Sequence, residues 1–169
     1  GTFLERADNT ARLLDVKFHA LTGGAAGEYF GSAAKDVQEV DFYHWSAILR
    51  SVSGFEVYRK VYRNVIRPER VAELLILRPD MPRSLAACIN EVVANLDLVA
   101  NTESSETRRR AGRLRSDLQY GRIDEILATG LHAYLTQFLD RVNDLGVGIS
   151  RDFLVPMAGR TMFADDLLF

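Results

Sequence analysis

Five residues near the start of the chain have the side-chain types and the spacing of a polar site. Glu5, Asp8, Arg12, Asp15 and His19 follow one another at intervals of three or four residues. On an α-helix these positions span only about 80° of the surface, so the side chains share one face. In one interpretation this face is solvated, and Asp8 pairs with Arg12 one turn later. Asp15 then pairs with His19 in the same way. In the other, a second segment covers the face and the charges form a buried polar site.

A second candidate for polar chemistry is Arg83 with Ser84. We expect Asp80 to cap a helix whose first turn contains Pro82. Arg83 and Ser84 then lie where free backbone N–H groups and the helix dipole favour an anion, such as a carboxylate from the first helix. Ordinary helix capping is the alternative. Arg6 is expected to face another side than the polar stripe, so a site that includes Arg6 needs other helices, and Arg83 is the leading candidate to complete it.

Metal and thiol chemistry are weakly supported. Asp41-x-x-His44 is a single carboxylate–histidine pair, and His19, His44 and His132 fall on three separate helices, so we expect no metal site. Cys88 is the one cysteine, which excludes an internal disulfide, and it lies in an apolar stretch typical of a core. The sequence contains no glycine-rich phosphate loop and no nucleophile elbow, so no cofactor is expected.

Two further clusters have ordinary structural interpretations. The three arginines at 108–110 can grip phosphate only if they converge, and successive side chains on a helix point in different directions. We therefore favour a solvated face, partly neutralised by Glu106 and by other acidic residues. In Tyr43-His44-Trp45, an aromatic site competes with a core position for Trp45, and the apolar spacing around Trp45 favours the core.

The overall composition argues against nucleic-acid and membrane binding. The 169 residues carry a net charge of −2, with 18 Arg and 3 Lys, so no general attraction to phosphate backbones exists. The arginine bias fits buried ion pairs, or simply a GC-rich coding sequence. No apolar run approaches the roughly 18 residues of a membrane span, and no signal peptide opens the chain. We expect a cytoplasmic protein.

Apolar residues recur with helical spacing along the chain, and no strand alternation extends over a convincing length. We predict an all-α bundle of about six helices without a sheet. The predicted helices cover residues 3–21, 42–62 with a break at Ser53-Gly54, a short stretch after Pro68, about 81–99, 103–119 and a long final helix over 123–145. Residues 23–40 are predicted to be a loop, either mobile or functional. The first helix lacks a capping residue, so we expect it to continue a longer helix in a longer protein.

Four segments of the chain resemble the bacterial alpha-E family. The first is Gly1–Lys17, which contains Phe3-Leu4-Glu5-Arg6-Ala7-Asp8 and so the adjacent glutamate and arginine of the family's Glu-Arg motif. The others are Asp41–Ser51, Pro82–Leu85 and Arg122–Ile126, and the similarity extends to about Phe153. The resemblance implies a single helical domain over residues 1–155, equivalent to the second half of a tandem duplication, followed by a tail over 156–169.

The resemblance also implies a pathway and partners. Alpha-E proteins are typically encoded beside circularly permuted ATP-grasp ligases, transglutaminase-like proteins and peptidases, which implies a role in bacterial peptide synthesis or modification. Since no catalytic motif is visible, the favoured hypothesis is a non-catalytic helical partner or substrate-holding subunit of such a ligase or transglutaminase-like protein. One alternative is an enzyme of the same pathway that uses the carboxylates and arginines of the polar site. Another is a structural half that forms a homo-oligomer.

Overall fold

The computed structural model describes residues 1–22, 34–63 and 65–154, with the backbone alone for 20–22 and 34–40. Eight α-helices and a short π-helical turn make up this described part, and no strand occurs in it. They are α1 (Thr2–Thr22), α2 (Ala34–Ser51), α3 (Phe55–Tyr62), α4 (Pro68–Leu77), α5 (Leu85–Leu98), α6 (Ser105–Gln119), α7 (Ile123–Thr129), α8 (Leu131–Ile149) and η1 (Ser150–Leu154). The predicted all-α fold is confirmed, with more and shorter helices than the six expected.

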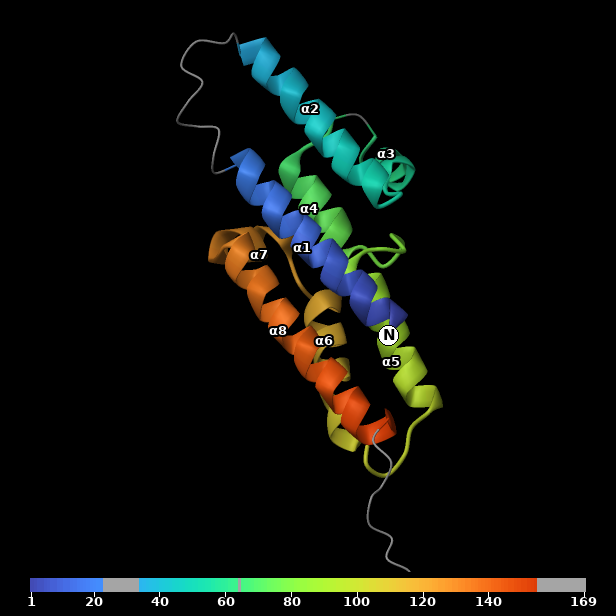
Figure 1. Cartoon of the computed structure of the whole chain (residues 1–169). Helices are drawn as coiled ribbons and strands as arrows, with labels where there is room; N and C mark the ends of the chain where they lie inside the picture. Colours follow the sequence, from blue (N-terminus) through green and yellow to red (C-terminus); the bar gives the residue numbers. More distant parts are fainter. Residues whose placement is uncertain (23–33, 64, 155–169) are drawn as a thin grey trace, which may run out of the picture.

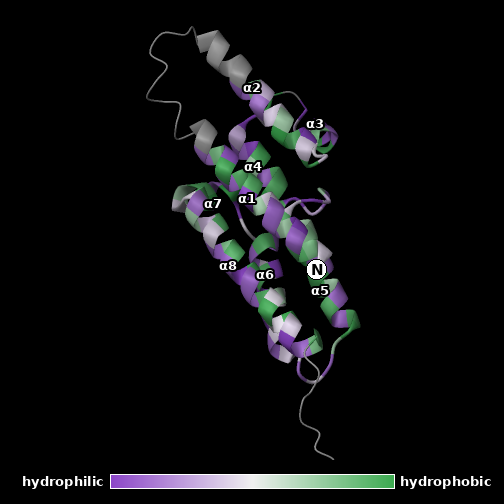
Figure 2. Cartoon of the chain, viewed as in Figure 1, coloured by the Kyte–Doolittle hydropathy of each residue, from purple (hydrophilic) through white to green (hydrophobic). Residues whose placement is uncertain are grey.

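The helices form an elongated bundle (Figure 1). The first helix, α1, runs along the bundle and packs against α5 and α8, while α6 packs against both of these helices. At one end α2 and α3 lie beside α4, which connects them to the rest of the bundle. Coloured by hydropathy, the helices carry apolar residues on some faces and polar residues on others, as expected when each helix buries one stripe (Figure 2).

The predicted apolar stripe of α1 faces the core. Ala7, Ala11 and Leu14 are completely buried, and the two alanines allow neighbouring helices to approach closely. Towards the end of α1, the Phe18 ring meets the Trp45 ring edge to face, with 5.8 Å between the ring centroids. Trp45 is 1% exposed, which confirms the prediction that it is a core residue.

The predicted loop over residues 23–40 is wrong for its second part. Ala34–Val40 are helical and form the start of α2, a segment that contains neither glycine nor proline. Residues 23–33 lie outside the described part of the chain. The predicted break at Ser53-Gly54 is confirmed, because Ser53 has a left-handed φ of 55° between α2 and α3.

The predicted long final helix over 123–145 is interrupted at Gly130. This glycine has a φ of 105°, which other residues adopt only with strain, and it separates α7 from α8. Its N–H donates to the carbonyl oxygens of Ile126 and Leu127 and so closes α7. The apolar pattern continues through the break because Ile126 and Leu131, on either side of it, pack in the same core. The tail beyond Leu154 lies outside the described residues.

Candidate functional site

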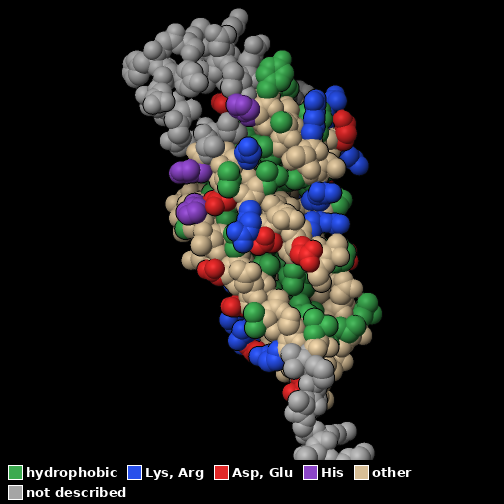
Figure 3. Space-filling view, viewed as in Figure 1, with side chains coloured by type: hydrophobic (Ala, Val, Ile, Leu, Met, Phe, Trp, Pro, Cys, Tyr) green, Lys and Arg blue, Asp and Glu red, His purple; other side chains and the backbone are tan. Residues whose placement is uncertain are grey.

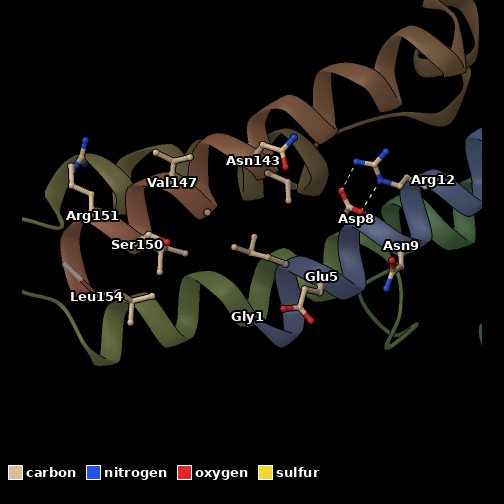
Figure 4. A pocket seen from close by; sticks show the side chains of 14 residues that line it. Gly1, Glu5, Asp8, Asn9, Arg12, Asn143, Val147, Ser150, Arg151 and Leu154 are labelled. Carbon is tan, nitrogen blue, oxygen red and sulfur yellow. Dashed lines mark hydrogen bonds and ion pairs between the residues drawn. The ribbon is translucent and has the colours of Figure 1, made fainter.

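The polar face of α1 borders an open groove of about 1240 Å³ that also runs along α8 and η1 (Figure 4). On the α1 side it is lined by Leu4, Glu5, Asp8, Asn9 and Arg12. On the opposite side it is lined by Val142, Asn143, Gly146, Val147, Ile149, Ser150, Arg151 and Leu154. In the space-filling view, acidic and basic side chains alternate over α1, with apolar side chains between them (Figure 3). We call this the α8 groove.

Asp8 and Arg12 form the predicted ion pair at the edge of the α8 groove. The Nε of Arg12 donates to one carboxylate oxygen of Asp8 over 2.8 Å, and Nη2 donates to the other over 3.2 Å. This two-point contact raises the pKa of Arg12, first through the hydrogen bond and then through the charge of Asp8. Since each charge satisfies the other, the pair offers a neutral polar surface to the groove.

Asp15 does not pair with His19 as predicted. Its carboxylate instead meets Nδ1 of His132 on α8, at 2.8 and 3.0 Å for the two oxygens. Asp15 lies on the edge of α1 that faces α8, and its side chain is 22% exposed, so the partner from α8 is closer than the one on its own helix. Asp15 therefore joins two helices of the bundle and does not line either groove described here.

A second groove, of about 470 Å³, lies on the other side of the exposed face of α1. Its lining comes from α1, from the end of α2 and from the segment before α5, and consists of Thr2, Glu5, Arg6, Asn9, Thr10, Leu13, Ser51, Val52 and Arg83. We call this the arginine groove. Glu5 and Asn9 line both grooves and so form the ridge between them, and Figure 4 shows both side chains directed away from α8.

Arg6 shares the arginine groove with Glu5, although we expected it to face another side of the helix. Adjacent residues project about 100° apart on an α-helix, and an open groove is wide enough to include both. Arg83, the leading candidate to complete a site with Arg6, lies in the same groove.

A second Glu-Arg pair, Glu69-Arg70, begins α4, where the Arg70 guanidinium lies 5.6 Å from the centre of the Tyr62 ring.

For Ser84 the structure shows ordinary helix capping, the alternative to the predicted anion site. Ser84 caps α5: its hydroxyl oxygen accepts the Ala87 N–H over 3.0 Å, and the hydroxyl donates to the Arg78 carbonyl over 2.6 Å. Ser84 is completely buried and its single O–H donor is already engaged, so it cannot donate a hydrogen bond to an anion. Asp80, the predicted cap, forms a two-point ion pair with Arg78 instead.

Arg83 precedes the cap and is held against α1 by its backbone. The buried hydroxyl of Thr10 donates to the Arg83 carbonyl over 2.9 Å. The Arg83 side chain is exposed, and within the described residues neither Arg83 nor Arg6 forms an ion pair with a carboxylate. The Arg6 guanidinium lies 5.5 Å from the centre of the Phe3 ring. Both arginines therefore line the groove without an ion-pair partner among the described residues.

The arginines at 108–110 of α6 behave differently, which confirms the expected solvated face. Arg108 pairs with Asp97 across to α5, while Arg109 and Arg110 both pair with Glu106 on their own helix. In each pair the arginine nitrogen lies 2.8 to 2.9 Å from its carboxylate oxygen. These charges are satisfied at the surface and do not converge on one point.

Cys88 is buried in the core, as predicted, and burial raises the pKa of its thiol to about 11. A thiol with so high a pKa carries almost no thiolate at neutral pH and is a poor nucleophile. Across residues 1–22, 34–63 and 65–154, no three His, Cys, Asp or Glu side chains gather in a group that could hold a metal ion. None of the helices in these ranges is long and apolar enough to cross a bilayer.

Four polar residues of the arginine groove were not predicted from the sequence, namely Thr2, Asn9, Thr10 and Ser51. A signal existed for three of them, because Asn9 lies four residues from Glu5, and Thr2 and Thr10 lie four residues from Arg6, which places each set on one side of α1. Ser51 comes from the end of α2 and carries no such signal.

Comparison with known proteins gives one match. A family model named Alpha-E, described as a predicted alpha-helical domain with a conserved ER motif, matches residues 1–154. In one-letter code ER denotes Glu-Arg, a pair that occurs twice in this chain, at Glu5-Arg6 in the arginine groove and at Glu69-Arg70 in the first turn of α4. No curated protein and no solved structure matches the chain significantly.

Proposed function

Because the chain belongs to the Alpha-E family, we propose that it is a non-catalytic helical domain that holds a peptide segment of a partner protein beside α1. The observation that carries this proposal is the form of the site. Two open grooves flank the same exposed face of α1, and both are lined by a mixture of charged, amide and apolar side chains. Grooves beside a helix that combine apolar contacts with a few polar groups are typical of peptide recognition.

The polar groups of the site support binding better than catalysis. Glu5 and Arg12 are exposed, and Asp8 is already engaged in its two-point contact with Arg12. An acid or base catalyst gains most of its strength from a water-excluded environment, which these open grooves do not provide. An extended peptide, in contrast, would exclude water from the groove on binding.

The α8 groove also offers apolar anchoring positions. Val147 and Leu154 are 69% and 72% exposed, and Leu4 lies opposite them on α1. Exposed aliphatic side chains that line one groove favour contact with an apolar side chain of a partner. The partner classes implied by the family are circularly permuted ATP-grasp ligases and transglutaminase-like proteins of bacterial peptide synthesis or modification, and we propose a ligase of this kind as the partner.

Photo-cross-linking tests this proposal. A photoreactive amino acid at position 147, in the α8 groove, should attach to a defined peptide segment of the cognate ligase. The same amino acid at Val65, between α3 and α4, is the matched control, since Val65 is 57% exposed and lines neither groove. Equal cross-linking at both positions, or none at 147, would contradict the proposal. Cross-linking of 147 to a second copy of this chain would instead support a homo-oligomer.

A further inference from the structure

Arg6 and Arg83 line the same groove, and neither has a carboxylate partner among the described residues. Arg12, Arg78 and the arginines at 108–110, in contrast, each contact a carboxylate at 2.8 to 2.9 Å. An exposed arginine side chain normally forms an ion pair when an acidic side chain lies within reach. Glu5 lines the same groove, yet it forms no ion pair with either arginine.

The two arginines are brought together by separate parts of the fold. Arg6 is fixed on α1, and the Thr10 hydrogen bond to the Arg83 carbonyl fixes the segment before α5 against the same helix. Both residues also act on the buried thiol of Cys88: burial raises the pKa of this thiol, and the positive charges of Arg6 and Arg83 lower it.

The groove contains neutral donors as well. Asn9 contributes a side-chain amide, Thr2 contributes a hydroxyl, and both residues are exposed. The charges of the lining residues sum to +1, from Arg6, Arg83 and Glu5. A guanidinium presents two parallel N–H donors that match the two oxygens of a carboxylate, a geometry that lysine cannot reproduce.

We propose that the arginine groove binds a carboxylate of the partner peptide, which Arg6 and Arg83 contact together. This inference rests on the proposed function, since it names the chemical class that the grooves beside α1 recognise. The carboxylate neutralises the single excess positive charge of the groove. Asn9 and Thr2 then donate to its remaining lone pairs or to the adjacent peptide carbonyl, while Glu5 accepts a peptide N–H.

A carboxylate suits this groove better than a phosphate. A phosphate monoester carries a charge of about −1.5 to −2 near pH 7, which exceeds the excess of the groove. The carboxylate of Glu5, which lines the same groove, would repel this larger charge more strongly. The observed residues therefore favour a monoanion.

Short peptides distinguish the sources of the carboxylate. The probes share an alanine background with a blocked N-terminus. One has a central aspartate and an amidated C-terminus, the second replaces that aspartate by asparagine, and the third has no aspartate but a free C-terminal carboxylate. Binding is followed by NMR through the side-chain N–H resonances of Arg6 and Arg83. We expect the first or the third peptide to bind and the asparagine peptide to bind at least about tenfold more weakly.

Variants test whether the two arginines make the contact. R6Q and R83Q should each weaken binding of the carboxylate peptide by about tenfold or more, since each removes a charge-assisted hydrogen bond. R113Q is the matched control, because Arg113 is exposed on α6, lies outside both grooves and has no carboxylate partner among the described residues. Circular dichroism melts of all three variants exclude unfolding as the cause.

Three results from the comparison of peptides or variants would overturn this inference. They are equal binding of the aspartate and asparagine peptides, equal loss in R113Q, and tighter binding of a phosphoserine peptide than of the aspartate peptide. An absence of binding by every peptide counts against it as well. If position 147 cross-links to the ligase while R6Q and R83Q leave ligase binding unchanged, the proposed function stands and the carboxylate site is wrong.

Discussion

The hydroxyl of Thr10 donates a hydrogen bond to the carbonyl oxygen of Arg83 over 2.9 Å, across 73 residues of sequence. Thr10 is 3% exposed, so no solvent replaces this bond if the hydroxyl is removed. The contact joins the helix that carries Glu5 and Arg6 to the segment that carries Arg83. The geometry of the arginine groove therefore depends on a buried, neutral hydroxyl group.

Substitution of Thr10 by valine should lower the free energy of unfolding by about 1 to 3 kcal/mol, because it leaves the Arg83 carbonyl without its donor. T136V is the matched control, since the hydroxyl of Thr136 donates to the His132 carbonyl at an exposed position on α8 and should cost less than about 0.5 kcal/mol. Urea unfolding followed by circular dichroism measures both. Equal stability of T10V and T136V would show that the Thr10 hydrogen bond does not hold the groove together.

The capping of α5 gives a second prediction. S84A removes the acceptor of the Ala87 N–H and the donor to the Arg78 carbonyl, so it should cost about 1 to 2 kcal/mol or more. D80A removes only a surface ion pair with Arg78 and should cost less than about 1 kcal/mol. Thermal melts that rank D80A as the more destabilised variant would support Asp80 as the cap and contradict the structure.

The close approach of α6 and α8 at Gly148 gives a third prediction. A Cβ added at Gly148 would lie 2.6 Å from the Thr107 hydroxyl oxygen, whereas a Cβ at Gly112 would meet nothing within 4 Å. G148A should therefore destabilise the bundle by about 1 to 3 kcal/mol. G112A should stabilise it by about 0.5 to 1 kcal/mol, because alanine has the better helix propensity. Chemical unfolding of the two variants should show opposite signs, and a stabilised G148A would contradict this helix contact.

A fourth prediction concerns pH. Hydrogen bonds from Arg109 and Arg110 lower the pKa of Glu106 from 4.5 to about 2. Because the folded-state pKa is the lower one, these ion pairs stabilise the fold fully above pH 4.5, and their contribution is lost as the pH falls towards 2. NMR titration of the Glu106 carboxyl carbon measures the pKa directly. R109Q should raise this pKa towards 4.5, and an unchanged value in R109Q would refute the assignment.

The sequence predicts the parts of this fold that depend on local spacing. The buried stripe of Ala7, Ala11 and Leu14 repeats within a few residues, so helical periodicity alone identifies α1. The break at Gly130 is not predictable in this way, since the residues on both sides pack in one core and continue the helical spacing of apolar residues. Ser84 and Asp80 are both good capping residues, and only the path of the chain decides which one caps α5.

The same distinction between local and distant contacts holds for the candidate site. The pair Asp8–Arg12 lies within one helix turn and is predictable, but the partner of Asp15 is His132, 117 residues away. The convergence of Arg83 with Arg6 likewise depends on how the segment before α5 folds back on α1. Contacts between distant residues require the three-dimensional packing of the helices, which one sequence does not contain in its local pattern.

The most direct test of the central claim, that the grooves beside α1 hold a partner segment, is calorimetric titration of the cognate ATP-grasp ligase into three forms of this protein. V147D places a charge in the α8 groove at an exposed position, so the fold should be retained, while V65D makes the same change outside both grooves. We predict that V147D raises the dissociation constant by about tenfold or more. V65D should have the same dissociation constant as the unmodified chain. Equal affinity of V147D and V65D would contradict the claim.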